Sequence, residues 1–278
     1  TVTLEELKGF RDALLELCIP VDLSAYNPID LCGTGGDGKD TFNISTLSSF
    51  VTAGAGVPVA KHGNYGVSSA CGSSNVLESL GVKFSNDTDF LERAIATTGI
   101  CVLHAPLFHP AMKNVAPIRR ELGVKTFFNM LCPMVNPSFP KNQMVVVFSL
   151  ELLRLYNYLY QETDKNYSIV HDLGGYDEIS LTNSVKIVSN DSEVLFSAED
   201  LGLQNNTQEA IFGGNTVADA SKIFKTIISG NGTEAQNNVR YDCQNAGLAA
   251  PCVAAPCDHG DCFVQYELQQ MGYTPAQL

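Results

Sequence analysis

No run of apolar residues in the 278-residue chain approaches the length of about 20 that a membrane-spanning helix needs. Residues 1–6 also lack the basic start and apolar stretch of a signal peptide. Basic side chains are scarce: 17 Lys and Arg stand against 30 Asp and Glu, which gives a net charge of −13 and repels phosphate backbones. The composition predicts a cytoplasmic protein that binds neither membranes nor nucleic acid.

Internal repeats and low-complexity segments are absent from the sequence as well. Hydrophobic residues make up 45% of the chain and charged residues 17%, which excludes disordered, collagen-like and coiled-coil proteins. At about 150 residues per domain, the length allows one large domain or two smaller ones. We therefore expect a globular protein with a sizeable core.

The nine cysteines form two groups. Five are scattered singly among apolar or small residues, as expected of reduced thiols that serve in packing: Cys18, Cys32, Cys71, Cys101 and Cys132. Four crowd together near the end of the chain: Cys243, Cys252, Cys257 and Cys262. With His259 they include possible zinc ligands, but their spacing lacks the usual C-x2-C pairs, so it does not favour a metal site.

The hydrophobic pattern alternates between strand-like and helix-like segments. Thr3 and Glu6 have capping-box spacing before an amphipathic helix over 4–18. Short apolar runs predict strands at 28–32, 57–60, 100–103 and 168–171, and a hairpin of 185–188 with 193–196. Further helices are expected from about 45, and over 73–80, 88–98, 144–160 and 216–229, whereas the tail from Tyr241 has no clear periodicity. This order predicts an α/β fold with a mostly parallel sheet, helices on both faces, and ligands beyond the carboxyl ends of the strands.

A glycine-rich segment, residues 33–38, follows the first predicted strand and precedes a helix that begins near Asn43. Glycines let backbone N–H groups approach an anion, and the helix N-terminus adds free donors, so the segment predicts a phosphate site. It also satisfies G-x-G-x-x-G, which leaves a dinucleotide site open, although that site wants an acidic residue about 20 positions on and the sequence there has Lys61. A plain turn with Asn43 or Ser45 capping a helix is the remaining alternative.

Three further polar clusters lie at predicted strand or helix ends. Lys61-His62-Gly63-Asn64, with Ser68, Ser69 and Ser73, suits a pocket for a phosphorylated sugar, although His62 is equally compatible with a structural role. Arg119 and Arg120 follow His109, and a helical arginine that faces a cleft can bind a carboxylate, although such a pair is more often a solvated helix face. Asp177 and Glu178 can hold magnesium beside a diphosphate, unless they form a surface turn.

Together, in this order and spacing, the four clusters closely resemble the anthranilate phosphoribosyltransferase family, over about residues 4–239. Residues 33–37, with Thr41 and 43–46, are similar to the diphosphate loop of that family, and 61–64 with 67–69 match its next motif. Residues 109–123 are similar to its anthranilate-binding helix, and 177–180 to its magnesium motif.

The resemblance implies a site residue by residue. The phosphoribosyl diphosphate ligands would be Gly33, Gly36, Asp37, Thr41, Asn43, Ile44, Ser45, Thr46, Lys61, His62, Gly63, Asn64, Ser68, Ser69 and Ser73. Gly33, Asn64 and Arg119 would contact anthranilate. Ser45 would help to hold one Mg²⁺ ion, and Asp177 with Glu178 a second. The implied enzyme is a transferase of tryptophan biosynthesis that has no covalent nucleophile and forms a homodimer.

The sequence departs from the family pattern at three places. The family normally begins with more of a small helical domain, so we divide the chain into a remnant of that domain (1–26), an α/β domain (27–240) and an atypical tail (241–278). Cys132 stands where the family usually has glycine, which bears on the backbone of that turn. After Val239 the expected alanine-rich helices give way to the cysteine-rich tail.

Two other functions stay open beside the transferase. The glycine-rich loop is compatible with a dinucleotide-dependent oxidoreductase, which tight NAD binding would reveal. A non-catalytic relative that binds nucleic acid is disfavoured by the net charge of −13 and by the presence of Arg119 and Asn64.

Overall fold

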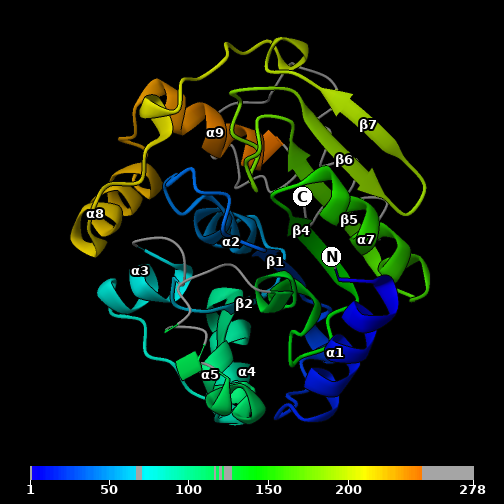
Figure 1. Cartoon of the computed structure of the whole chain (residues 1–278). Coiled ribbons are helices and arrows are strands. Elements are labelled where there is room, and N and C mark those ends of the chain that lie inside the picture. The colour runs from blue at the N-terminus through cyan, green and yellow to red at the C-terminus, as the bar shows by residue number, and fades with distance from the viewer. Residues whose placement is uncertain (1, 67–70, 116, 119–120, 122–126, 246–278) are drawn as a thin grey trace.

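A seven-stranded sheet forms the centre of the computed structural model, which describes residues 2–66, 71–115, 117–118, 121 and 127–245 (Figure 1). The strand order is β3-β2-β1-β4-β5-β6-β7. Five strands run parallel: β1 (Ile29–Gly33), β2 (Val59–Gly63), β3 (Ile100–His104), β4 (Asn142–Val146) and β5 (Asn166–Asp172). The hairpin β6 (Val185–Ser189) and β7 (Glu193–Phe196) joins antiparallel at one edge. The expected mostly parallel sheet is confirmed.

Helices cover both faces of this sheet. On one face, α2 (Ile44–Gly54), α3 (Ser73–Ser79), α8 (Val217–Ile228) and α9 (Glu234–Asn245) enclose the largest core cluster. On the other face lie α1 (Leu4–Glu16), α4 (Thr88–Thr98), α5 (Ala105–Phe108) and α7 (Leu150–Gln161), over two smaller clusters. Since strand side chains alternate between faces, Leu31 points into the first core while Asp30 and Cys32 face the opposite side.

Short 3-10 helices occupy most of the connections. Their bounds are Ser24–Tyr26 (η1), Pro110–Asn114 (η2), Phe127–Met130 (η3), Cys132–Met134 (η4), Glu199–Leu201 (η5) and Glu209–Ile211 (η6). Among these, η3 and η4 lie beside the carboxyl ends of β1 and β2, with η4 in contact with both strands. They close the face of the sheet that α2 does not cover.

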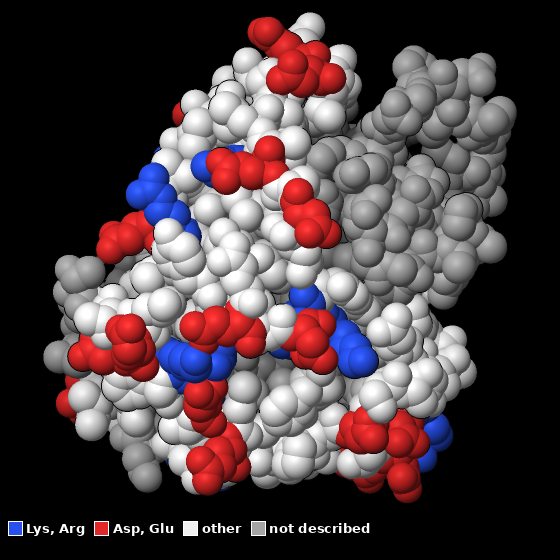
Figure 2. Space-filling model, turned by 90° about the vertical axis from the view of Figure 1, so that its right-hand side faces the viewer, with Lys and Arg blue, Asp and Glu red and all other residues white. Residues whose placement is uncertain are grey.

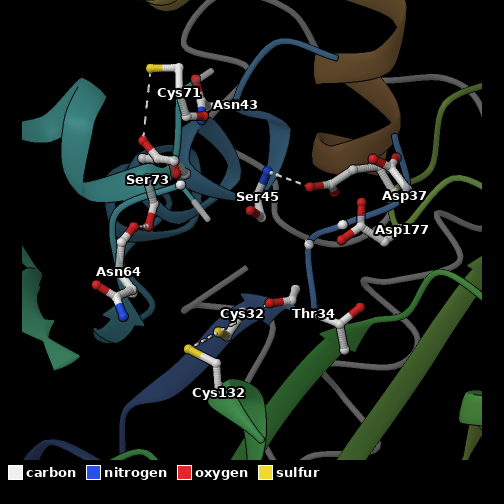
Figure 3. Close-up of a pocket in the computed structure, with 18 of the residues that line it drawn as sticks. Cys32, Thr34, Asp37, Asn43, Ser45, Asn64, Cys71, Ser73, Cys132 and Asp177 are labelled. Atoms are coloured by element: carbon white, nitrogen blue, oxygen red, sulfur yellow. Dashed lines mark hydrogen bonds between the residues drawn. The ribbon is translucent and has the colours of Figure 1, made fainter. Parts of the chain in front are cut away.

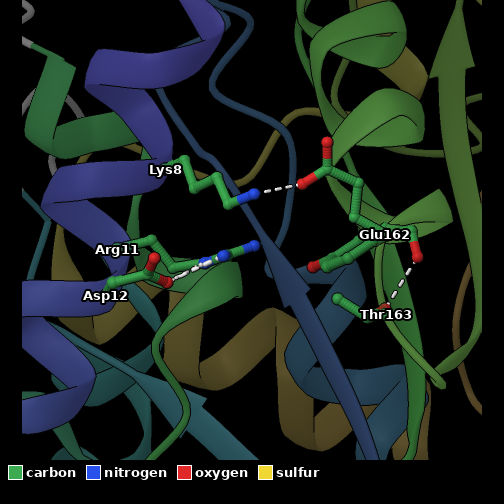
Figure 4. Close-up of polar contacts among 6 residues, drawn as sticks. Lys8, Arg11, Asp12, Glu162 and Thr163 are labelled. Atoms are coloured by element: carbon green, nitrogen blue, oxygen red, sulfur yellow. Dashed lines mark hydrogen bonds and ion pairs between the residues drawn. The ribbon is translucent and has the colours of Figure 1, made fainter.

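The first helix begins as its sequence predicts. Thr3 Oγ1 accepts a hydrogen bond of 3.2 Å from the Glu6 backbone N–H, and the Glu6 carboxylate accepts from the Thr3 N–H in return. Leu7 and Leu14 are buried against the core beneath α7, and each fully buried leucine contributes about 1.5–3 kcal/mol. Lys8 of α1 also pairs with Glu162 just after α7 (Figure 4), but both groups are half exposed, so this pair contributes at most about 1 kcal/mol.

Basic side chains on the face that carries α1 and α7 lie next to acidic ones (Figure 2). Arg11 pairs with Asp12 at 2.7 Å, and Lys186 of β6 pairs with Glu193 of β7 at 2.6 Å. Such pairing removes the uncompensated positive charge that a nucleic-acid surface needs. Of the described helices, none is long and apolar enough to span a membrane.

Three local predictions are wrong. The expected helix over 144–160 is a buried strand, β4, followed by α7, because Ser149 caps a new helix by accepting a 3.2 Å hydrogen bond from the Leu152 N–H. The helix expected from His109 starts instead as the 3-10 helix η2, which Pro110 opens. Regular structure does not end at Tyr241, since α9 continues to Asn245. The other predicted helices and strands are confirmed with shifts of a few residues at their ends.

Candidate functional site

A cavity of about 210 Å³ opens at the carboxyl ends of β1 and β2. Its walls come from the loop after β1, the start of α2, the end of β2, the start of α3, residues 128–132, and the loop after β5 (Figure 3). From β1 the sheet grows toward β2 and β3 on one side and toward β4 and β5 on the other. In open α/β sheets this switch in direction creates a crevice for ligands.

Glycine is required where the loop after β1 turns into the cavity. A Cβ added to Gly33 would lie 2.7 Å from Val146 Cγ2 and 3.3 Å from Asp177 Oδ2. Gly36 has a φ of 80°, a conformation that L side chains rarely adopt. The loop can therefore bring bare backbone close to a ligand, as the sequence predicts.

The amino end of α2 points its backbone donors toward the same cavity. Asn43 does not cap the helix with its side chain, because its Nδ2 donates to the Cys71 carbonyl oxygen at 3.1 Å. The Thr46 hydroxyl is buried and has no hydrogen-bond partner in the described structure. A helix start with an unsatisfied buried hydroxyl is suited to an anion.

Three carboxylates line the cavity beside these groups: Asp37 and Asp177, which Figure 3 labels, and Glu178, which accepts a 3.2 Å hydrogen bond from the Ser45 N–H. Burial, together with the nearby charges of Asp37 and Glu178, raises the pKa of Asp177 well above its usual range. Burial raises the pKa of Glu178 to about 8, against the opposing effect of its hydrogen bond from the Ser45 N–H. Such crowding is unfavourable for charged carboxylates unless a cation lies between them.

Lys61 and Ser73 form the opposite wall of the cavity. The Lys61 ammonium is buried and donates a 2.8 Å hydrogen bond to the carbonyl oxygen of Leu31. Ser73 Oγ donates to the Asn64 carbonyl oxygen at 3.2 Å, and it would lie 2.5 Å from a Cβ at Gly63. The lysine side chain thus lies next to the cavity, while the serine fixes the end of β2.

The structure gathers most of the sequence-predicted site residues around this cavity. Those that line it are Gly33, Gly36, Asp37, Thr41, Asn43, Ser45, Thr46, Lys61, His62, Gly63, Asn64, Ser73, Asp177 and Glu178. Ile44 does not, because its side chain lies in the core under α2. Ser68, Ser69 and Arg119 lie outside the described residues, as do Cys252, Cys257, His259 and Cys262.

Sequence reasoning missed the wall that η3 and η4 supply. Phe128, Asn129 and Cys132 line the cavity beside Tyr65. The only signal in the sequence was Cys132 at a position where the resembling family has glycine. Cys132 opens η4 and does not have a positive φ, so this backbone accommodates a cysteine side chain.

The donor set fits a hard divalent cation such as Mg²⁺. Asp37 Oδ2 is buried with no hydrogen-bond partner in the described structure, and the carboxylates of Asp177 and Glu178 are buried beside it. Magnesium is usually held by one or two carboxylates together with phosphate oxygens. This side of the cavity can therefore hold a magnesium ion with a bound diphosphate.

Comparison with known proteins identifies relatives of this chain. The model of the "Glycosyl transferase family, a/b domain" matches residues 25–257, and thus extends beyond Val239, where the sequence pattern places the end of the resemblance. Anthranilate phosphoribosyltransferase of Flavobacterium psychrophilum is 69% identical over 252 residues, which cover 91% of this chain and 76% of the relative. The corresponding protein of Cytophaga hutchinsonii is 55% identical over 249 residues, which cover 90% of this chain and 75% of the relative.

Solved structures agree with these relatives. The anthranilate phosphoribosyltransferase of Thermus thermophilus superposes with a TM-score of 0.76 at 33% identity, over 89% of this chain and 74% of that one. The yeast enzyme in complex with PRPP and Mg superposes with a TM-score of 0.81 at 26% identity, over 99% of this chain and 73% of that one. The chain therefore belongs to the anthranilate phosphoribosyltransferase family, within the glycosyl transferases that share this α/β domain.

Proposed function

We propose that this chain transfers the phosphoribosyl group of phosphoribosyl diphosphate to anthranilate, a step of tryptophan biosynthesis. The observation that carries the proposal is the arrangement of a bare glycine loop and the start of α2 around the carboxylates of Asp37, Asp177 and Glu178. A diphosphate needs both anion donors and a bridging cation, and this cavity has backbone donors next to carboxylates that suit a cation. Family membership supplies the two substrates.

The loop after β1 and the start of α2 would hold the diphosphate. Backbone N–H groups near Gly33 and Gly36 and the hydroxyl of Thr46 are the donors, and Lys61 adds positive charge from β2. Ser73, together with Ser68 and Ser69, would hold the sugar phosphate. Gly33, Asn64 and Arg119 would contact anthranilate, with the planar guanidinium of Arg119 paired to the carboxylate of the substrate.

The reaction needs placement rather than a covalent nucleophile. The aromatic amine attacks the anomeric carbon of the ribose while the bond to diphosphate breaks, and positive charge grows on the sugar. Held in one cavity, the two substrates react as if the step were unimolecular. The donors at the start of α2 then stabilise the negative charge that develops on the leaving diphosphate.

Magnesium, when bound, supplies the counter-charge for the diphosphate. Two ions are proposed, one held with the help of Ser45 and the other by Asp177 and Glu178. The unpartnered Asp37 Oδ2 and the raised pKa values of Asp177 and Glu178 support a cation on this wall. The yeast relative was solved with PRPP and Mg, which also supports magnesium use.

A dinucleotide-dependent oxidoreductase is the second candidate, and the cavity favours it less. A dinucleotide site needs an acidic residue near the end of β2 to bind a ribose diol. Residues 61–64 contain no acidic residue, and Lys61 among them is buried. A nucleic-acid-binding relative would need an uncompensated basic surface, which a net charge of −13 opposes.

One assay tests the proposal. Purified chain is mixed with anthranilate, phosphoribosyl diphosphate and Mg²⁺, and the loss of anthranilate fluorescence is followed together with diphosphate release. Equal amounts of the two signals are expected, and omission of either substrate should abolish both. Tight binding of NAD without any consumption of anthranilate would overturn the proposal in favour of the oxidoreductase.

Three further proposals concern the whole chain. We place it in the cytoplasm, which the five free cysteines among the described residues support, because disulfides are rare there. We propose a homodimer, to be tested by analytical ultracentrifugation. The division into 1–26, 27–240 and 241–278 also stays a proposal, supported by the way α1 packs onto α7 from outside the sheet.

A further inference from the structure

Two cysteine thiols that lie 100 positions apart in the sequence meet in the wall of the cavity. The Cys32 thiol, near the end of β1, donates a hydrogen bond of 3.8 Å to Cys132 Sγ, at the start of η4. Figure 3 shows the two side chains pointing toward each other. The sequence predicts two separate packing residues, whereas the fold makes them a pair.

The sheet and η4 hold this pair in place. Cys32 belongs to a buried strand, and η4 contacts both β1 and β2. The Gln143 side chain of β4 donates a hydrogen bond to the Pro133 carbonyl oxygen, which ties η4 to the sheet. His62 Nδ1 of β2 lies 2.9 Å from the carbonyl oxygen of Cys132. The two sulfurs are therefore held close together without a bond between them.

The two sulfurs differ in their exposure. Cys32 is buried, whereas Cys132 is partly exposed, and both line the cavity. The cavity holds about 210 Å³, which is ample for a small peroxide, since one water molecule takes up about 30 Å³ in the liquid. An oxidant that enters the cavity therefore reaches Cys132 first, and the Cys32 thiol lies next to the sulfur that reacts.

Cys132 is also the most acidic thiol among the described cysteines. The hydrogen bond from Cys32, and the charge of His62 with its Nδ1 at 3.7 Å, hold the pKa of Cys132 well below its usual range against the effect of burial. Burial instead raises the pKa of Cys71, which lines the same cavity, and raises that of Cys101 to about 12. Because the thiolate is the form that reacts with peroxides, oxidation should select Cys132.

We propose that Cys132 and Cys32 form a reversible oxidation site that reacts with small hydroperoxides. The Cys132 thiolate attacks one peroxide oxygen, the O–O bond breaks, and the departing alkoxide or hydroxide takes up a proton from solvent. Cys132 is then a sulfenic acid. Cys32 sulfur attacks the Cys132 sulfur, an S–S bond forms, the S–O bond breaks, and the hydroxyl leaves with the Cys32 proton as water. The two thiols lose two electrons, and the peroxide gains them.

A neighbouring thiol is what makes such oxidation reversible. Reactive cysteines of redox sensors often have a resolving cysteine beside them, which converts the sulfenic acid to a disulfide before irreversible oxidation. Here the sulfurs need to approach from 3.8 Å to about 2.05 Å. The resembling family usually has glycine at the position of Cys132, so the site is a property of this chain rather than of the transfer reaction. The disulfide would also change the cavity wall beside the proposed substrate site.

Peptide mapping of the full-length chain tests the proposal. The reduced protein is exposed to hydrogen peroxide without substrates, its remaining thiols are blocked with N-ethylmaleimide, and its peptides are analysed by mass spectrometry without reductant. We expect a linked pair of peptides that contain Cys32 and Cys132, which a phosphine reductant should separate. The same measurement follows the four cysteines of the tail, because each peptide is identified by its sequence.

Two variants separate the two steps, and a third is the control. Cys32→Ser removes the resolving thiol, so a sulfenic acid should accumulate at Cys132 and be trapped by dimedone. Cys132→Gly introduces the residue that the family usually has and should leave Cys32 unoxidised at the same peroxide concentration. Cys71→Ala removes another thiol of the same cavity and should leave the linked peptides unchanged. Circular dichroism verifies that each variant is folded.

Rates of alkylation compare the thiols in the unmodified chain. At about pH 7, iodoacetamide should label Cys132 at least about tenfold faster than Cys71. The proposal is overturned if Cys132 is labelled no faster than Cys71, if peroxide yields no linked peptides, or if Cys132 links to a different cysteine. Transferase activity enters none of these measurements, so a failure of the proposed function would leave their outcomes unchanged.

Discussion

The backbone N–H of Ser45, in the first turn of α2, donates a hydrogen bond of 3.2 Å to Glu178 Oε1 in the loop after β5. Two walls of the cavity, far apart in sequence, are thereby joined (Figure 3). The helix start that would bind diphosphate is occupied by an acidic side chain of the protein. A cation held by Asp177 and Glu178 would draw the Glu178 carboxylate toward it and leave the Ser45 N–H available for a phosphate oxygen.

Replacing both acidic groups tests this coupling. Asp177→Asn with Glu178→Gln should lower turnover on the order of a hundredfold and flatten its dependence on Mg²⁺, because the diphosphate loses its counter-charge. Initial rates over a magnesium titration measure both effects. Glu199→Gln, an exposed carboxylate on η5, serves as the control and should leave the curve unchanged. A double variant that keeps normal magnesium activation would show that the metal binds elsewhere.

Arg119→Lys tests the proposed anthranilate contact. The compact ammonium of lysine would replace a planar guanidinium that can bind a carboxylate through two hydrogen bonds. KM for anthranilate should therefore rise at least about tenfold, while KM for phosphoribosyl diphosphate changes little. Steady-state kinetics with each substrate varied in turn give both constants. The same exchange at Arg93, exposed on α4, should alter neither. Equal losses for the two substrates would remove Arg119 from the anthranilate site.

The helices and strands that could be predicted from the sequence are those with a clear hydrophobic periodicity or a helix-capping residue. Thr3 with Glu6 marks the start of α1, and Thr216 opens α8 through the same capping box with Asp219. The prediction failed at 144–160, because a fully buried parallel strand and a buried helix are both continuous apolar runs. Only the cap at Ser149 separates β4 from α7, and its role depends on the turn that β4 imposes.

The residues of the site that lie in loops at strand ends could be predicted from the sequence, whereas the wall that η3 and η4 supply could not. Glycines and hydroxyls at strand ends identify the cavity because parallel strands end at one edge of the sheet. The Cys32–Cys132 contact could not be predicted, since it joins residues 100 positions apart through the packing of η4. The sequence singles out His109 but not the lack of partners for its ring nitrogens, which is a property of its buried surroundings.

Asn136 should matter for stability because one carboxamide satisfies three buried groups. Its Nδ2 donates to the Ala60 carbonyl oxygen at 2.9 Å, and its Oδ1 accepts from the N–H and hydroxyl of Ser138 at 2.9 and 2.8 Å. Asn136→Ala leaves all three groups without this hydrogen-bond partner and should lower the free energy of unfolding by about 2–4 kcal/mol. Ser138→Ala removes one of the three and should cost less. Urea denaturation measures both, and equal losses would contradict this account.

His104 should make the protein sensitive to acid. Its Nδ1 lies 2.9 Å from the Ser74 hydroxyl, and its ring stacks on Phe84 at 4.4 Å. Burial, and then the charge of His62, lower the pKa of His104 from 6.5 to about 4. A group whose pKa is lower in the folded state contributes stability that is complete above its unfolded pKa. That contribution is lost as the pH falls from about 6.5 toward 4, because the unfolded chain takes up the proton first.

His104→Gln should therefore make the free energy of unfolding depend less strongly on pH between about 6.5 and 4. The variant loses stability at about pH 7, and its deficit relative to the unmodified chain should shrink as the pH is lowered to about 4.5. Ser74→Ala breaks the same hydrogen bond but leaves the titrating ring, so its slope against pH should persist. Unfolding free energies from urea titrations at several pH values decide between them. A constant deficit for His104→Gln across this range would show that His104 does not remain neutral in the folded protein.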